Sequence, residues 1–95
     1  LEGASPAEAD AYIHRQLGAI LRQPELRCQE LLDTLDSWLR CMGNQRRMAR
    51  ELHLHYNTVS YRLQQLWTLL AADPADPVKR LALETALYLY RYRRV

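Results

Sequence analysis

Apolar residues recur along this chain at three- and four-residue intervals, the spacing of helices that bury one side. The pattern predicts five helices and no strand. The alternation of Tyr88, Tyr90 and Tyr92 resembles a strand, but the Leu, Ala, Glu and Arg residues around it favour a helix. We therefore expect an all-α fold, a five-helix bundle.

The first two helices are delimited by proline and glycine. Ser5 and Pro6 fit an N-cap and a first turn, and Pro24 ends or interrupts the helix that follows. A second helix covers about residues 24–42, and Gly43 lies where a left-handed residue closes a helix. Its expected core positions are Leu26, Cys28, Leu31, Leu32, Leu35, Trp38, Leu39 and Met42.

Residues 44–70 are the most informative part of the chain, because they predict two helices joined by a tight turn. Asn44 fits the cap of the first helix, His53 occupies the left-handed position of the turn, and Leu54 is its apolar plug. The expected packing positions are Met48, Ala49, Leu52, Leu54, Val59 and Leu63. This spacing predicts a helix-turn-helix motif at about residues 44–67.

The second helix of this pair has two different sides. Its apolar stripe consists of Val59, Leu63, Leu66, Trp67 and Leu70. Its polar stripe consists of Thr58, Tyr61, Arg62 and Gln65, with Asn57 beside it. Hydroxyl, amide and guanidinium groups hydrogen-bond base edges and phosphates, so this division is typical of a recognition helix that lies in the major groove of DNA.

The charges are unevenly distributed, although the net charge is only +2. Residues 1–36 carry seven acidic and three basic side chains, whereas residues 37–95 carry ten basic and four acidic ones. Twelve of the thirteen bases are Arg, which suits bidentate contact with phosphate or guanine. The asymmetry favours a half that faces a polyanion, with solvated helix surface as the alternative.

Length and composition limit the class of protein. Ninety-five residues with 48% hydrophobic content suffice for one small domain, and a chain that begins with Leu is expected to be part of a longer protein. There is no secretory signal and no apolar run near the roughly 20 residues of a membrane span, so we expect no membrane contact. Cys28 and Cys41 lie about 20 Å apart if they share a helix, so we expect two free thiols.

Catalysis and metal binding find little support in the sequence. It has no Gly-rich phosphate loop and no evident set of nucleophile, base and orienting group. His53 and His55 form an H-x-H pair, but two residues in a turn rarely suffice for a metal site. We expect no enzyme activity and no cofactor.

The string HYNTVSYRL at residues 55–63 resembles the signature of the C-terminal helix-turn-helix domain of the PucR/CdaR family of bacterial transcriptional regulators, roughly H-x-N-T-[LV]-x-Y-R-[LI]. Residues 31–35 are similar to its L-L-x-T-L, residues 43–44 to its G-N, and residues 76–87 to its closing helix. Met48 departs from the pattern, because a second small residue is common there. The arrangement also resembles the DNA-binding end of the factor for inversion stimulation.

The resemblance covers about residues 26–90. It implies a cytoplasmic DNA-binding domain, residues 26–95, at the end of a longer regulator, with residues 1–25 forming a helix and linker from the upstream region. It also implies that a small metabolite acts on sensing domains absent from this chain.

From the residues themselves we assign the contacts with double-stranded DNA. The recognition helix is expected to contact DNA through Tyr56, Asn57, Thr58, Tyr61, Arg62 and Gln65. Arg62 lies at the edge of the polar stripe and reaches either a phosphate or a guanine, and Tyr61 meets the backbone or the bases. Phosphate contacts are expected from Asn44, Arg46, Arg47, Arg50 and His55. The alternative function is a helical dimerisation or protein-interaction module that binds no DNA.

The last helix, from Asp76-Pro77 to about residue 93, is apolar on two sides. One stripe consists of Val78, Leu81, Ala82, Thr85 and Leu89, and the other of Leu83, Ala86, Leu87 and Tyr90. A single motif touches few base pairs, so we expect two copies on half-sites about 34 Å or a multiple apart. The expected homodimer surface is the last helix at Leu83, Leu87 and Tyr90.

Overall fold

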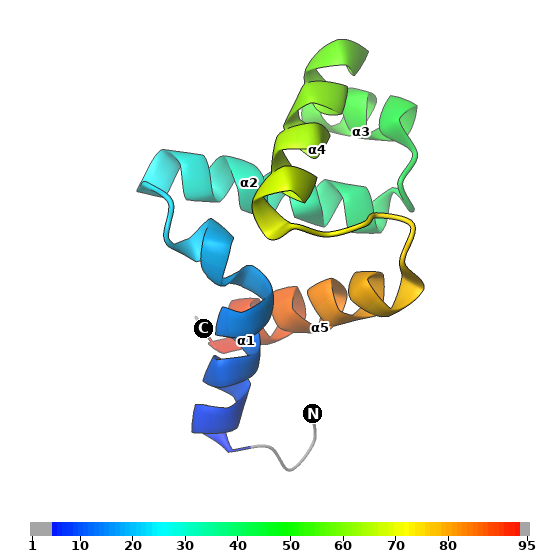
Figure 1. The fold of residues 1–95 in the computed structure, drawn as a ribbon. Helices are drawn as coiled ribbons and strands as arrows, with labels where there is room; N and C mark the ends of the chain where they lie inside the picture. The colour runs from blue at the N-terminus through cyan, green and yellow to red at the C-terminus, as the bar shows by residue number, and fades with distance from the viewer. Residues whose placement is uncertain (1–4, 94–95) are drawn as a thin grey trace.

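The computed structural model describes residues 5–93, and within them the chain forms five α-helices and no strand (Figure 1). The helices are α1 (Pro6–Leu21), α2 (Glu25–Arg40), α3 (Gln45–Leu52), α4 (Tyr56–Leu70) and α5 (Pro77–Arg93). In Figure 1, α3 and α4 form one end of the molecule, α2 crosses its middle, and α1 and α5 form the other end. The predicted all-α, five-helix fold is confirmed.

Most helix ends follow the predicted capping chemistry. The Ser5 hydroxyl accepts the Glu8 N–H at 3.1 Å, and the Asp76 carboxylate accepts the Val78 N–H at 2.9 Å. At the other end of α2 the chain turns sharply, because Met42 and Gly43 are both left-handed, with φ of 54° and 77°. The second helix is therefore two residues shorter than predicted at its C-terminal end.

One hydrophobic core joins helices from the whole chain. Its most buried members are Leu17, Ile20, Leu35, Met48, Val59, Leu66, Leu83 and Ala86. Helix α1 packs against α2, α4 and α5, and Leu17 and Ile20 place it firmly within this core. The predicted domain boundary after residue 25 therefore falls between helices that share one core.

A pair of tryptophans fixes α4 across α2. The Trp38 and Trp67 rings meet edge to face, with centroids 4.7 Å apart and planes 73° apart. The Arg80 guanidinium of α5 lies 5.0 Å from the Trp38 ring centroid and donates to the Leu39 carbonyl at 3.2 Å. The Trp38 side chain of α2 thus contacts both α4 and α5 and fixes their positions relative to α2.

Two predicted core positions of the second helix are wrong. Leu26, in the first turn of α2, is 87% exposed, and Met42 is 73% exposed, because it lies in the turn after the helix. Among the residues that the structure describes, no helix combines the length and apolar content of a membrane span. Cys28 and Cys41 are both free thiols.

The two apolar stripes of α5 are not equally buried. Leu83 and Leu87 are buried in the domain's own core, and Tyr90 is half-buried. The predicted dimer surface is therefore wrong in these residues, because Leu83 and Leu87 are not available to a partner. The exposed apolar side chains of α5 are instead Val78, Leu81, Tyr88 and Tyr92.

Candidate nucleic-acid interface

The turn between α3 and α4 has the predicted left-handed residue. His53 has φ 56° and ψ 44°, which ends α3 and redirects the chain. The Leu54 N–H then donates to the Ala49 carbonyl at 3.0 Å, so the backbone folds back on α3. Leu54 itself is half-buried against the core, as a plug of the turn.

The start of α4 is capped by His55. Its Nδ1 accepts the Asn57 N–H at 3.0 Å, so the His55 side chain caps the helix in addition to its predicted role as a phosphate contact. Because Nδ1 accepts, the neutral ring carries its proton on Nε2, and the exposed imidazole can donate to an anion from there. The histidine thus supports the helix through one nitrogen and leaves the other for a ligand.

The inner side of α4 is held rigidly. Val59, Leu63 and Leu66 are buried, as the apolar stripe predicts. A polar link adds to them, because the Ser60 hydroxyl donates to Gln45 Oε1 of α3 at 2.6 Å. Neither residue belongs to the apolar spacing, so the sequence does not indicate this link, and only the placement of the two helices reveals it.

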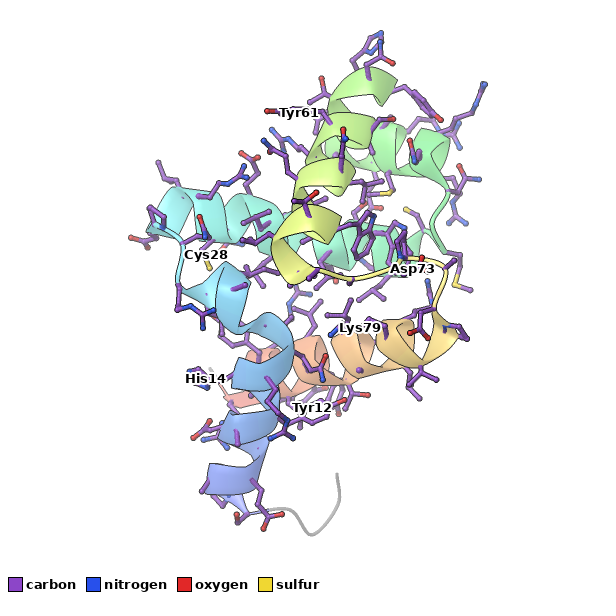
Figure 2. All side chains as sticks on the ribbon, viewed as in Figure 1. Tyr12, His14, Cys28, Tyr61, Asp73 and Lys79 are labelled. Carbon is purple, nitrogen blue, oxygen red and sulfur yellow. The ribbon has the colours of Figure 1, made fainter. Side chains whose placement is uncertain are left out.

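The exposed residues of α4 lie on a line that is displaced around the helix axis from the predicted polar stripe. The exposed positions are Asn57, Tyr61, Gln64 and Thr68, which follow a spacing of four, three and four residues. Tyr61 is 60% exposed and points away from α1 and α5 (Figure 2), and Tyr56 in the first turn is 44% exposed. Gln64 was missed, although its spacing from Asn57 and Tyr61 could have identified it.

Three residues of the predicted stripe are half-buried on the side of α4 that faces α2: Thr58, Arg62 and Gln65. The Arg62 Nε lies 3.6 Å from a carboxylate oxygen of Glu30 on α2. Gln65 Nε2 donates to the Tyr61 hydroxyl at 2.7 Å, and Gln65 Oε1 accepts from Arg27 at 3.0 Å. The structure thus brings Tyr61 and Gln65 together and places Arg62 at the edge of the surface.

Basic side chains project from α3 beside this surface. Arg46, Arg47 and Arg50 are exposed, and the Arg46 guanidinium lies 6.0 Å from the centroid of the Tyr56 ring. The Asn44 side chain accepts the Arg47 N–H at 3.1 Å, so its oxygen serves as the cap of α3. Any contact of Asn44 with an anion would therefore use its amide group or the helix N-terminus.

Glu51 is the acidic residue of residues 44–70, and it lines one hollow together with Arg47 and Arg50. Glu51 accepts hydrogen bonds from Cys41 at 2.9 Å and Ser37 at 3.2 Å, and it pairs with Arg40. These contacts bind α3 to α2 and take up the carboxylate. The outer surface of α3 and α4 therefore combines hydrogen-bonding side chains with three arginines, and its acidic side chain, Glu51, is already paired with Arg40.

This arrangement suits a long polyanion with hydrogen-bonding groups at its centre. Arginines bind phosphates, and a rigid helix with amide and hydroxyl side chains can read base edges in a groove. Among the described residues, no group of three or more His, Cys, Asp or Glu side chains is placed to hold a metal ion.

Comparison with known proteins agrees with this description. A family model described as the PucR C-terminal helix-turn-helix domain matches residues 31–89, which span α2 to α5. Uncharacterized proteins from Mycobacterium bovis and Mycobacterium tuberculosis are each 39% identical over 56 residues, or 59% of this chain. Those residues make up only 14% of each relative's own length. No solved structure gives a significant match.

Proposed function

From the premise that the chain belongs to the family of PucR C-terminal helix-turn-helix domains, we propose that it recognises a specific double-stranded DNA sequence. Membership of this family makes the chain a DNA-binding output domain of a transcriptional regulator. The observation that carries the proposal is the outer side of α4, where Asn57, Tyr61 and Gln64 are exposed on a helix whose inner side is locked into the core. The alternative is a protein-interaction module that binds no DNA, and a DNA-binding experiment distinguishes the two.

In the proposed complex the N-terminal half of α4 enters the major groove. Asn57 and Gln64 offer amides for base edges, and the Tyr61 hydroxyl lies between them. Tyr56 and Thr58 lie at the helix start, where they reach the groove wall. Half-buried Arg62 and Gln65 act from the edge of the same surface.

Phosphates on either side of the groove are the proposed partners of the basic side chains. Arg46, Arg47 and Arg50 project from α3, the helix that crosses the backbone in this type of motif. His55 donates from Nε2, and the N-terminus of α3 behind the Asn44 cap offers backbone N–H groups. These contacts set the register of the domain and carry little sequence information.

Two copies of the domain are proposed to act together. Val78, Leu81, Tyr88 and Tyr92 are exposed on α5, and with half-buried Thr85 they follow a repeating spacing of three and four residues. That spacing is the seam along which two helices pack in a coiled coil. A symmetric α5 pair would place two recognition helices on two half-sites.

The response to a small metabolite is proposed to reside outside this chain. The mycobacterial relatives are several times longer than their matching segment, which leaves room for sensing domains. We place such a regulator in the bacterial cytoplasm, where its DNA lies. The effector would then act by changing the spacing or orientation of two output domains.

Selection of bound fragments from random duplex DNA, followed by titration of the enriched duplex at several salt concentrations, tests the proposal. An enriched, roughly palindromic motif and a steep fall of affinity with salt are expected. Salt-dependent binding without an enriched motif would reject sequence specificity for this domain alone. Absence of binding at low salt would favour the interaction module instead.

A further inference from the structure

A chain of hydrogen bonds links α2 to the exposed side of α4. Arg27 Nη1 donates to Gln65 Oε1 at 3.0 Å, and Gln65 Nε2 donates to the Tyr61 hydroxyl at 2.7 Å. Arg27 lies in the first turn of α2, ahead of the helix-turn-helix and of the residues that match the family model. Neither the motif nor the family match assigns it a role.

Donor and acceptor chemistry fixes the direction of this chain. A guanidinium only donates, so the Gln65 atom that faces Arg27 must be the amide oxygen. The Gln65 NH₂ group therefore faces Tyr61, and it can only donate to the hydroxyl oxygen. The Tyr61 hydrogen is then left to point elsewhere, and the exposed hydroxyl presents it to solvent or a ligand.

Arg27 is itself held in place beside α4. Its Nη1 lies 3.6 Å from Glu30, and the same carboxylate oxygen lies 3.6 Å from Arg62. The carboxylate thus lies between two guanidinium groups and balances part of their charge. Because the Arg27 side chain is only 36% exposed, its guanidinium is better placed to orient Gln65 than to reach far into solvent.

We propose that Arg27 is a positioning residue for DNA recognition, which acts through Gln65 to hold the Tyr61 hydroxyl as a hydrogen-bond donor. This inference rests on the proposed DNA-binding function. The group that Tyr61 meets is then an acceptor: a phosphate oxygen, guanine O6 or N7, adenine N7 or thymine O4. The amino groups of adenine and cytosine are disfavoured at that point, because they donate.

A double-mutant cycle on the enriched duplex tests the relay. Arg27→Met keeps an unbranched apolar stem but removes the guanidinium donors, and Tyr61→Phe removes the hydroxyl. Each single variant is expected to bind roughly two- to tenfold more weakly than wild type, and the double variant no more weakly than Tyr61→Phe. Arg27→Lys, which still donates, should recover most of the affinity.

The result that would overturn the inference is an equal loss from Arg27→Met in the wild-type and Tyr61→Phe backgrounds. Such a loss, with a salt slope lower by about 0.9, would identify a direct phosphate contact instead. No loss at all would equally reject the relay. Arg15→Met, which removes the same charge from the exposed surface of α1, is the control, and thermal melts verify folding.

Failure of this inference can be distinguished from failure of the proposed function. If the wild-type protein does not bind duplex DNA at low salt, the proposed function itself is wrong. If the wild type binds and the Arg27 effect persists without the Tyr61 hydroxyl, only the positioning role is wrong.

Discussion

The Ser60 hydroxyl donates to Gln45 Oε1 across 2.6 Å, and this bond joins the second turn of α4 to the first residue of α3. Apolar packing alone would let the two helices slide slightly, because it has little directional preference. A short hydrogen bond fixes their relative position. The exposed side of α4 and the arginines of α3 are thereby presented as one surface.

Ser60→Ala tests this link. We expect a loss of roughly 0.5–1.5 kcal/mol in the free energy of unfolding, the usual net contribution of one hydrogen bond, and a weaker affinity for DNA. Denaturant titration and binding to the enriched duplex measure the two effects. Thr68→Ala, an exposed position on the same helix, is the control. Equal stability of the two variants would show that the link contributes nothing.

The left-handed residue at the end of α4 offers a stabilising substitution. Ala71 has φ 50°, a conformation that costs an L-residue about 1 kcal/mol and glycine almost nothing. Ala71→Gly is therefore expected to raise the free energy of unfolding by up to about 1 kcal/mol. The adjacent Ala72→Gly should not stabilise the fold, because Ala72 has no positive φ. A destabilised Ala71→Gly variant would contradict this explanation.

Helix α1 should be as necessary to the fold as the helix-turn-helix. Leu17 is fully buried, and Leu17→Ala is expected to lower the free energy of unfolding by roughly 2–5 kcal/mol, as Leu66→Ala in α4 should. Urea unfolding compares the two variants. A loss below about 1 kcal/mol for Leu17→Ala alone would show that α1 is a dispensable linker, in agreement with the predicted boundary after residue 25.

The proposed α5 seam predicts an effect on association. Leu81 is 63% exposed, so Leu81→Glu should leave the fold intact and weaken self-association at least about fivefold. Leu26→Glu, at a residue that is 87% exposed on α2, is the matched control. Sedimentation equilibrium provides the readout. A wild type that stays monomeric at high concentration would show that the seam does not join two copies of this domain.

Local signals in the sequence were strong enough to place the helices. Capping residues such as Ser5 and Asn44, and the left-handed His53, act within a few residues of themselves, so their roles follow from the sequence. The buried side of α4 also follows, because Val59, Leu63 and Leu66 repeat at helical spacing. The helix caps and the buried side of α4 both depend only on residues close together in the sequence.

Positions that depend on the packing of several helices could not be predicted in this way. Leu83 and Val78 are both apolar, and only the placement of α5 against α1 and α2 decides which of them is buried. The same applies to Arg62, which is half-buried because it faces Glu30 of α2. Arg27 of α2 contacts the exposed side of α4 through Gln65, and nothing in the sequence around Arg27 indicates this contact.

Affinity of the Asn57→Ala, Tyr61→Ala, Gln64→Ala triple variant for the enriched duplex tests the central claim most directly. All three side chains are exposed, so the fold should survive, as circular dichroism can verify. We predict that binding weakens at least about a hundredfold and that sequence preference is largely lost, while salt-dependent nonspecific binding through α3 remains. Affinity within twofold of wild type, with preference intact, would contradict the assignment of this side of α4 as the recognition surface.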